Sequence, residues 1–368
     1  MALNVTIRVD SSIHIGSGHV MRCLTLADEL KSTCDAEVNF ICRDFKGQIG
    51  EIIQQRGYSL TLLHELDQIY KPTNDDPTHA EWLGVSWEQD SKETINAMKG
   101  RKADWLIIDH YGIEQRWHNK LKPYTNKIMV IDDLADRKLN CNLLLDQTYG
   151  RNAENYQSIV SSNAKLLLGT KYALLRPEFA IMRPKAVDKR NEFNGVKRIL
   201  ISMGGMDPDN VTGRILETLA QVEWDKSLVV DVVLGLDSTY LEYLKNQVAE
   251  YQFTVNFLSN VNNMAELMFK ADLAIGAGGS TSWERCCLGL PTLIVITADN
   301  QNEIVHQLEK ANTVVSIGRY DSIDIVNVAR ILSDFTHSFS KFSQMSKNAF
   351  NICKGNGALL CVKEILCC

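Results

Sequence analysis

The chain has 368 residues, of which 45% are hydrophobic and 23% charged, and its formal net charge is −6. This length exceeds one ordinary hydrophobic core and predicts two domains of roughly 150 to 200 residues, while the composition is that of a globular protein. The acidic balance gives no support to nucleic-acid binding, which needs a basic face for the phosphates, but it leaves open a nucleotide as a small ligand.

The N-terminal residues MALNVTIRVD enter a strand pattern at once and lack the basic region, apolar run and cleavage site of an export signal. The longest apolar runs, such as PTLIVITA at 291–298, are much shorter than the roughly 20 residues that span a bilayer. We therefore expect a cytoplasmic protein without membrane contact. The ten cysteines form no CxxC pair and no zinc-type spacing, so we interpret them as reduced, small apolar residues.

Short apolar runs alternate with helical periods through the first half of the chain. The runs lie at 5–10, 36–42, 103–111, 127–133 and 141–147. After the first run, Val20, Leu24, Ala27 and Leu30 recur at three- and four-residue spacing, which predicts a helix that packs one face on a sheet. This alternation is typical of a parallel sheet with crossover helices. The segment 70–90 carries prolines, acids and tryptophans, and we interpret it as a surface loop leading into a helix, with a loop that lines a cleft as the alternative.

Residues 180–197 lose apolar periodicity and gain charge, which is typical of a linker and predicts a domain boundary near residue 187. A second series of apolar runs follows at 196–205, 227–235, 253–259, 271–279 and 291–297. We therefore expect an α/β fold with two doubly wound, Rossmann-like domains that face each other across a cleft. They span 1–186 and 187–345, and a helical segment at 346–368 is expected to pack back on the first domain. In such sheets, ligands bind beyond the carboxyl ends of the strands.

The loop HIGSGHVMR, at 14–22, is the first candidate site. Gly16 and Gly18, on either side of Ser17, permit positive φ and close ligand approach, and the helix N-terminus that follows attracts anions. A simple glycine-rich helix start is the alternative. His19 lies in the first turn, where the helix dipole disfavours the imidazolium, so a neutral ring suited to a general base is expected. Capping or packing is the alternative role for His19.

Polar residues also end the predicted strands. Asp10 is placed either to orient His19 or a sugar hydroxyl, or to cap Ser12 or a nearby backbone N–H. Tyr111, in the run DHYG, is the residue that we expect to contact substrate, because polar groups at strand ends point at the ligand crevice. Asp132 and Asp133 also end a strand, and we interpret them as turn caps.

Two glycine pairs follow strands in the second half, at Gly204 and Gly205 and at Gly278 and Gly279. The second pair, with Ser280, opens a helix and forms an anion cradle, and two cradles in one domain favour a diphosphate ligand.

Glu284, one turn into that helix, is placed to accept hydrogen bonds from a ribose diol, with stabilisation of the helix start as the alternative. The sequence has no Walker lysine motif, no GxGxxG and no cluster with metal-ligand spacing, so we expect no metal and no cofactor.

Together these segments resemble the UDP-sugar hydrolases of pseudaminic acid biosynthesis in bacteria. The matching segments, in order within residues 5–305, are RVDSSIHIGSGHVMR, IIDHYG, IDDLADR, LLDQTYG, GTKYALLRPEF, SMGGMDPDN and GAGGSTSWERCCLGLP. Members of that family cleave UDP-2,4-diacetamido-2,4,6-trideoxy-β-L-altropyranose to the free sugar and UDP. Their GT-B fold is similar to that of the peptidoglycan UDP-GlcNAc transferase.

The resemblance implies a role for each matching residue. His19 is the base that activates water, and Tyr111 and Asp10 complete the catalytic set. The residues implied for the sugar and diphosphate are Gly16, Ser17, Gly18, Arg22 and Arg176, and those for UDP are Gly204, Gly205, Leu258, Gly278, Gly279, Ser280, Glu284 and Gln301. Leu258 is expected in the loop before a helix at 262–269, where the fold seats the uracil. Trp283 replaces the asparagine of some relatives, which leaves the contact from that position open.

UDP leaves readily, so one base and backbone N–H groups suffice, without the carboxylate pair of ordinary glycosidases. A glycosyltransferase of the same fold, or a regulator that binds UDP-sugars without catalysis, are the competing interpretations. In each case the expected partner is a small UDP-sugar rather than nucleic acid or membrane, and we expect a monomer.

Overall fold

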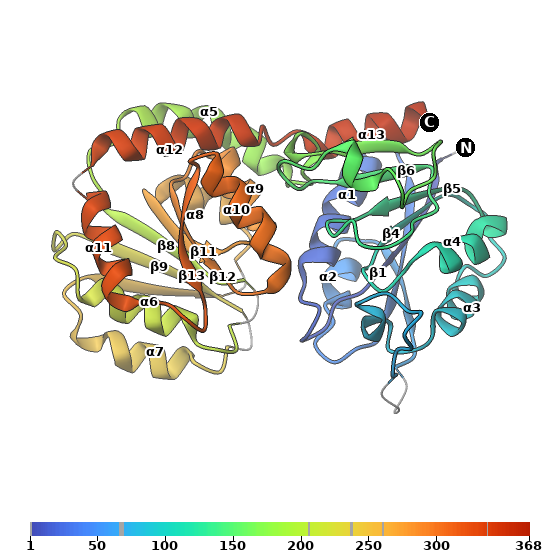
Figure 1. The fold of residues 1–368 in the computed structure, drawn as a ribbon, viewed down its shortest axis with the longest axis horizontal. Coiled ribbons are helices and arrows are strands. Elements are labelled where there is room, and N and C mark those ends of the chain that lie inside the picture. The colour runs from blue at the N-terminus through green and yellow to red at the C-terminus, as the bar shows by residue number, and fades with distance from the viewer. Residues whose placement is uncertain (1, 66–69, 205–206, 236–237, 260, 337) are drawn as a thin grey trace. The chain divides into compact units, whose positions relative to one another are not determined.

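The computed structural model describes residues 2–368 except 66–69, 205–206, 236–237, 260 and 337. The chain forms two compact units, one from Met1–Leu174 together with Asn356–Cys368 and the other from Leu175–Gly355 (Figure 1). Each unit is built around one parallel sheet with helices on both faces, as the alternating apolar runs predict.

Unit 1 has a seven-stranded sheet in the order β3-β2-β1-β4-β5-β6-β7. Its strands are β1 (Asn4–Val9), β2 (Glu37–Arg43), β3 (Ser59–Leu63), β4 (Ala103–Asp109), β5 (Thr125–Ile131), β6 (Leu143–Asp146) and β7 (Lys165–Leu168). Its α-helices are α1 (Gly18–Cys34), α2 (Gly50–Gln55), α3 (Trp87–Ala97), α4 (Gln115–Leu121) and α13 (Gly357–Cys367). The strand order reverses between β1 and β4, so the loops after these two strands lie where such sheets bind ligands.

Side-chain alternation assigns the residues of β4 to two separate cores. Trp105 and Ile107 belong to the core that contains α1 and α13, whereas Leu106 and Ile108 belong to the core that contains Trp117 of α4. Asp109, the last residue of β4, therefore falls on the α1 side of the sheet.

Unit 2 has a six-stranded parallel sheet in the order β10-β9-β8-β11-β12-β13. Its strands are β8 (Arg198–Ser202), β9 (Val229–Leu234), β10 (Thr254–Ser259), β11 (Leu273–Ala277), β12 (Thr292–Ile296) and β13 (Val314–Arg319). Its α-helices are α5 (Pro177–Asn191), α6 (Val211–Ala220), α7 (Leu241–Gln247), α8 (Met264–Lys270), α9 (Thr281–Cys287), α10 (Asn302–Lys310), α11 (Ile325–Thr336) and α12 (Phe339–Ile352). Here the order reverses between β8 and β11, and both predicted glycine pairs follow these strands.

The predicted linker is wrong, because residues 177–191 form α5 and the chain passes from unit 1 to unit 2 between 174 and 175. Phe179 and Ala186 are fully buried, and the Arg190 guanidinium donates to the carbonyls of Met268 and Ala271. Of the other twelve residues of this helix, five are charged and none is buried, which is why its sequence looks like a linker.

The C-terminal segment divides between the units. Helix α12 belongs to unit 2, and the chain returns to unit 1 at 355/356 rather than at 346. There α13 packs beside α1, and Ala358, Cys361, Val362 and Ile365 lie in the core.

All ten cysteines are free thiols, and seven of them are buried. No helix in the described part of the chain is long and apolar enough to cross a bilayer.

Candidate active site

A buried carboxylate holds the imidazole of His19. His19 lies in the first turn of α1 with 11% of its side chain exposed, and its Nδ1 is 2.7 Å from Oδ1 of the fully buried Asp109. β1 and β4 pair in parallel with Val9 opposite Asp109, which brings the end of β4 beneath the start of α1. A carboxylate on Nδ1 favours the tautomer that carries its proton there and leaves Nε2 as a proton acceptor. This arrangement is suited to a general base.

Arg22, one turn further along α1, binds the same carboxylate. Its Nε lies 2.6 Å from Oδ2 of Asp109 and its Nη2 lies 2.7 Å from Oδ1, a bidentate pair, while Nη1 donates to Asp133. Burial alone would raise the pKa of Asp109, but Arg22 and then His19 outweigh it and hold that pKa well below its ordinary value. The structure thus places Arg22 as a support beneath His19, with its guanidinium engaged by two carboxylates.

Aromatic rings pack around His19. The Tyr111 ring meets the imidazole edge-on with centroids 4.7 Å apart, and Trp82 stacks on Tyr111 at 5.5 Å. Tyr111 is only 4% exposed, and its hydroxyl donates to Asp133 at 2.9 Å. His79 lies against both Trp82 and Tyr111. The segment 70–90 therefore does more than form a surface loop, because it reaches the surroundings of His19.

Asp10 does not orient His19, so that prediction is wrong. Its carboxylate is fully buried, accepts hydrogen bonds from Arg8 Nη1 and from the Arg43 amide, and lies 3.2 Å from His110 Nε2. Asp10 is two residues beyond Arg8 and shares its side of the sheet, whereas His19 is on the other side. Nor does Asp10 cap Ser12, whose hydroxyl instead accepts from the amides that follow it in the loop.

The loop before α1 leaves space for a ligand. Gly16 has a φ of +78°, and a Cβ built on Gly16 or Gly18 would meet no atom within 4 Å in the part of the chain that the structure describes. The first hydrogen bond of α1 runs from the Met21 amide to the Ser17 carbonyl, and the Ser17 side chain does not cap the helix. The amides that precede Met21 in the first turn are the ones that a helix N-terminus offers to an anion.

In unit 2, the loops after β8 and β11 contain two open glycines. Gly204 has a φ of +98°, and a Cβ built on Gly204 or Gly279 would meet no atom of the described residues within 4 Å. Ser280 precedes α9 without a side-chain cap, as Ser17 precedes α1. Gly205 lies outside the described residues.

Gly278 and Gln301 serve the loop itself. The Gly278 amide donates to the Val295 carbonyl and to Oε1 of Gln301, and a Cβ on Gly278 would come within 2.6 Å of Val305. Gln301 also accepts from the Thr297 amide at 2.9 Å. Both residues therefore hold the glycine loop against the end of β12, rather than offering these groups to UDP.

Glu284 is a free acceptor beside this loop. Its carboxylate forms no hydrogen bond with any residue that the structure describes, and Arg176 Nη2 is 3.8 Å away. Burial raises the pKa of Glu284 to about 7, an effect that Arg176 and Arg285 partly offset. Trp283, by contrast, is 1% exposed, which excludes a ligand contact from its ring in this conformation.

Leu258 lies inside β10, opposite Val233 of β9, and not in the loop before α8, so this part of the prediction is wrong. The apolar run 253–259 continues as a strand through Ser259.

Among the described residues, no three His, Cys, Asp or Glu side chains gather in a way that could hold a metal ion.

The chain is similar in sequence to one domain family and to several known proteins. Residues 213–357 match the model of the glycosyltransferase family 28 C-terminal domain. The chain is 27% identical over 305 residues to an uncharacterized protein of Methanocaldococcus jannaschii, covering 82% of this chain but only 57% of that protein's length. It is 24% identical over 339 residues to the spore coat polysaccharide biosynthesis protein SpsG of Bacillus subtilis, with 90% of each chain covered.

A third relative is the UDP-2,4-diacetamido-2,4,6-trideoxy-β-L-altropyranose hydrolase of Campylobacter jejuni. The chain is 26% identical to it over 309 residues, which cover 84% of this chain and 97% of the hydrolase. Among solved structures, MurG of Acinetobacter baumannii superposes with a TM-score of 0.70 at 13% identity, with all of both chains covered. The UDP-GlcNAc 2-epimerase of Neisseria meningitidis, bound to UDP-GlcNAc, gives 0.63 at 13% identity, again over the whole of both chains. The chain thus has the GT-B fold and is similar to the UDP-diacetamido-trideoxy-altropyranose hydrolase, as its motifs predict.

Proposed function

We propose that this chain is an enzyme that hydrolyses a UDP-linked 2,4-diacetamido-2,4,6-trideoxy hexose to the free sugar and UDP, in the synthesis of pseudaminic-type acids. The observation that carries the proposal is the His19–Asp109 pair, which presents Nε2 of His19 as a base at the start of α1. The similarity to the Campylobacter hydrolase supports the choice of substrate. Unit 1 acts on the sugar, and the glycine loops and Glu284 of unit 2 bind UDP.

In the proposed reaction, Nε2 of His19 removes a proton from a water molecule while the water oxygen attacks the anomeric carbon. The bond from that carbon to the diphosphate oxygen breaks, and its electron pair leaves with UDP. Asp109 remains ionised and stabilises the imidazolium that forms, and Arg22 fixes the carboxylate in place. Amides of the glycine loops receive the charge that develops on the diphosphate.

One isotope experiment tests which bond breaks. In water labelled with oxygen-18, attack at the anomeric carbon places the label in the sugar and none in UDP, and the sugar first appears with inverted configuration. Attack at phosphorus would instead label UDP and preserve the anomer, and finding label in UDP by mass spectrometry would overturn the proposal.

Variants of His19 test the base. His19→Ala and His19→Asn are expected to lose roughly two to four orders of magnitude in turnover, because general-base assistance contributes about that much. UDP affinity is expected to stay unchanged, because the nucleotide is assigned to unit 2. Near-normal turnover in either variant would show that His19 is not the base and that the loop at 14–22 only begins the helix.

A glycosyltransferase is the second candidate, because the domain family that matches residues 213–357 is named for transferases. The two activities differ in the acceptor. A hydrolase releases UDP and free sugar from the UDP-sugar alone, whereas a transferase needs a second substrate for comparable turnover. Incubation with a panel of UDP-linked diacetamido sugars, with and without added acceptors, separates them and identifies the sugar.

A further inference from the structure

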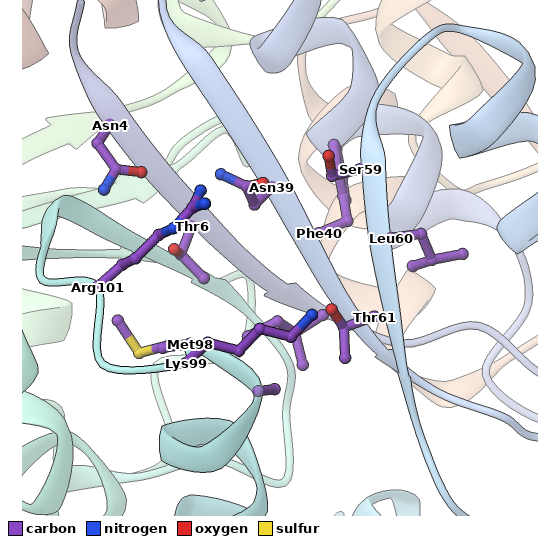
Figure 2. A pocket seen from close by; sticks show the side chains of 12 residues that line it. Asn4, Thr6, Asn39, Phe40, Ser59, Leu60, Thr61, Met98, Lys99 and Arg101 are labelled. Carbon is purple, nitrogen blue, oxygen red and sulfur yellow. The ribbon is translucent and has the colours of Figure 1, made fainter.

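Unit 1 contains a cavity of about 400 Å³ that the proposed reaction does not use (Figure 2). It is lined by residues of β1, β2 and β3 and by the loop after α3. Asn4 and Ser59 are the first residues of their strands, so the cavity reaches the amino ends of the sheet. His19 and Asp109 lie at the opposite, carboxyl ends. The volume falls within the range of small-molecule sites.

The floor of the cavity is a row of polar side chains on one face of three adjacent strands. Thr6 pairs in register with Asn39, and Asn39 pairs with Ser59, while Thr61 follows on the same face. Their side chains form no hydrogen bond with any described residue. Thr6 is only 6% exposed as a residue, but its hydroxyl oxygen is not one of the buried, unpartnered atoms in the described part of the chain, so it is open to the cavity. The row therefore offers hydroxyl and amide groups that can both donate and accept hydrogen bonds.

Two cations border this floor. In Figure 2, the side chains of Lys99 and Arg101 extend from the loop after α3 over the strands. Lys99 forms no ion pair within the described part of the chain, and Arg101 lies 3.4 Å from Glu37. Asp104 also borders the cavity, because its Oδ2 accepts from the Asn4 amide, so Lys99 is the cation at this cavity that has no carboxylate partner among the described residues.

Lys99 has a φ of +51°, the left-handed conformation that glycine adopts with less strain. The fold alone therefore favours glycine at this position, as at Gly100, the next residue, which has a φ of +73°. The lysine at this position places a charged amine at the cavity.

From this geometry we propose that the cavity is a second binding site, for a hexose-sized sugar that carries a phosphate or carboxylate group. The cations match the anionic group, and the polar row matches the sugar hydroxyls. A nucleotide fits less well, because the cavity has no aromatic face for a base. The one ring that lines it, Phe40, is 1% exposed and packs in the apolar core.

Calorimetric titration of the full chain saturated with UDP tests the site. The probes are glucose 6-phosphate, glucuronate, neutral glucose and inorganic phosphate. At least one charged sugar is expected to bind ten or more times as tightly as glucose and as inorganic phosphate, and the comparison of the two charged sugars identifies the preferred anion. Equal affinities for inorganic phosphate and the charged sugars would overturn the proposal, as would no binding at all.

Three variants separate this site from the fold and from the active site. Lys99→Gly is expected to weaken binding about tenfold or more, since a charge-assisted hydrogen bond is lost, while the melting temperature stays the same or rises because strain is relieved. Thr6→Val keeps the shape of the side chain and is expected to reduce the preference for a charged sugar over inorganic phosphate. His19→Ala is expected to bind the probes as the wild type does, which would hold even if the proposed hydrolysis failed.

The reverse pattern would refute the site. If Lys99→Gly lowered the melting temperature and left affinity unchanged, the lysine would serve only the end of α3. If binding were lost in His19→Ala and kept in Lys99→Gly, the sugar would be occupying the active site instead.

Discussion

Asp109 is a fully buried carboxylate whose charge is stabilised by two residues of α1. Asp133 offers a natural comparison, because it also binds Arg22 and accepts from Tyr111 but forms no hydrogen bond or ion pair with His19 in the described structure. Variants of the two carboxylates therefore distinguish a role in orienting His19 from a role in supporting the surrounding structure.

Asp109→Asn is expected to lower kcat by roughly two to four orders of magnitude, because an amide neither holds the Nδ1–H tautomer nor stabilises the imidazolium. Asp133→Asn is expected to cost much less, since the His19–Asp109 pair remains. Steady-state kinetics on both variants, with circular dichroism to confirm folding, provide the measurement. Equal losses of kcat in the two variants would show that the carboxylates act only by holding the structure together.

The proposed contact between Glu284 and UDP predicts that UDP binding is sensitive to pH. Its free carboxyl has a pKa raised to about 7 by burial, and hydrogen bonds donated by a ribose diol favour the carboxylate and so lower that pKa on binding. UDP binding should then release a proton, and affinity should fall as the pH drops below about 7, by up to tenfold per pH unit.

Calorimetry in buffers of different ionisation enthalpy measures the proton released. Glu284→Gln is the control, because UDP's own phosphate still titrates in that variant while the component from Glu284 disappears. Glu284→Ala should weaken UDP binding by about 1 to 3 kcal/mol, because a hydrogen bond to a charged group is lost. Identical pH profiles for the wild type and Glu284→Gln would remove Glu284 from the UDP site.

At the scale of elements, the apolar runs predict the inner strands and the edge strand β10, whereas the three strands that they do not predict all lie at sheet edges. β3 and β7 are the two edges of the first sheet, and β13 is an edge of the second. An edge strand has one neighbour and is less buried, so β3 and β7 show short, half-exposed patterns that do not stand out in sequence. Helix α5 was missed for the same reason, because few of its residues are buried.

The position of the candidate site could be predicted, but the partner of His19 could not. The loop at 14–22 follows a strand wherever that strand lies in the sheet, so His19 could be identified locally. The contact with Asp109 depends on β1 pairing with β4, across about a hundred residues, and local sequence does not encode that order. The alternation along the strand does indicate the side on which Asp109 lies, because Asp109 shares it with Trp105 and Ile107, which are apolar and face α1.

The return of the chain into unit 1 depends on one close backbone approach. A Cβ on Gly357, at the start of α13, would lie 2.2 Å from the Ala173 carbonyl oxygen. Gly357→Ala therefore requires a backbone shift and is expected to destabilise unit 1 by about 1 to 3 kcal/mol. Gly18→Ala, in open space at the start of α1, is the matched control and should be neutral or slightly stabilising. Thermal unfolding followed by circular dichroism decides, and equal melting temperatures for the two variants would contradict this view of α13.

For the whole molecule, the chemistry of the leaving group determines whether hydrolysis is expected to need a divalent cation. A diphosphate in an enzyme is stabilised by a divalent cation, by a lysine clamp, or by backbone amides and helix N-termini. In unit 2, the glycine loops after β8 and β11 have open space at Gly204 and Gly279 among the described residues, and the serine before α9 does not cap that helix.

We therefore expect hydrolysis of the UDP-sugar to continue at an unchanged rate in EDTA, and added magnesium to leave kcat and KM as they are. The measurement is UDP release after exhaustive chelation, with and without magnesium, compared in wild type and in Glu284→Ala. The Glu284→Ala variant controls for an indirect effect on UDP binding, since it is expected to weaken nucleotide binding while both glycine loops stay intact. If chelation abolished turnover and magnesium restored it, the cation would stabilise the departing diphosphate, and the amides of the glycine loops would be insufficient for that step.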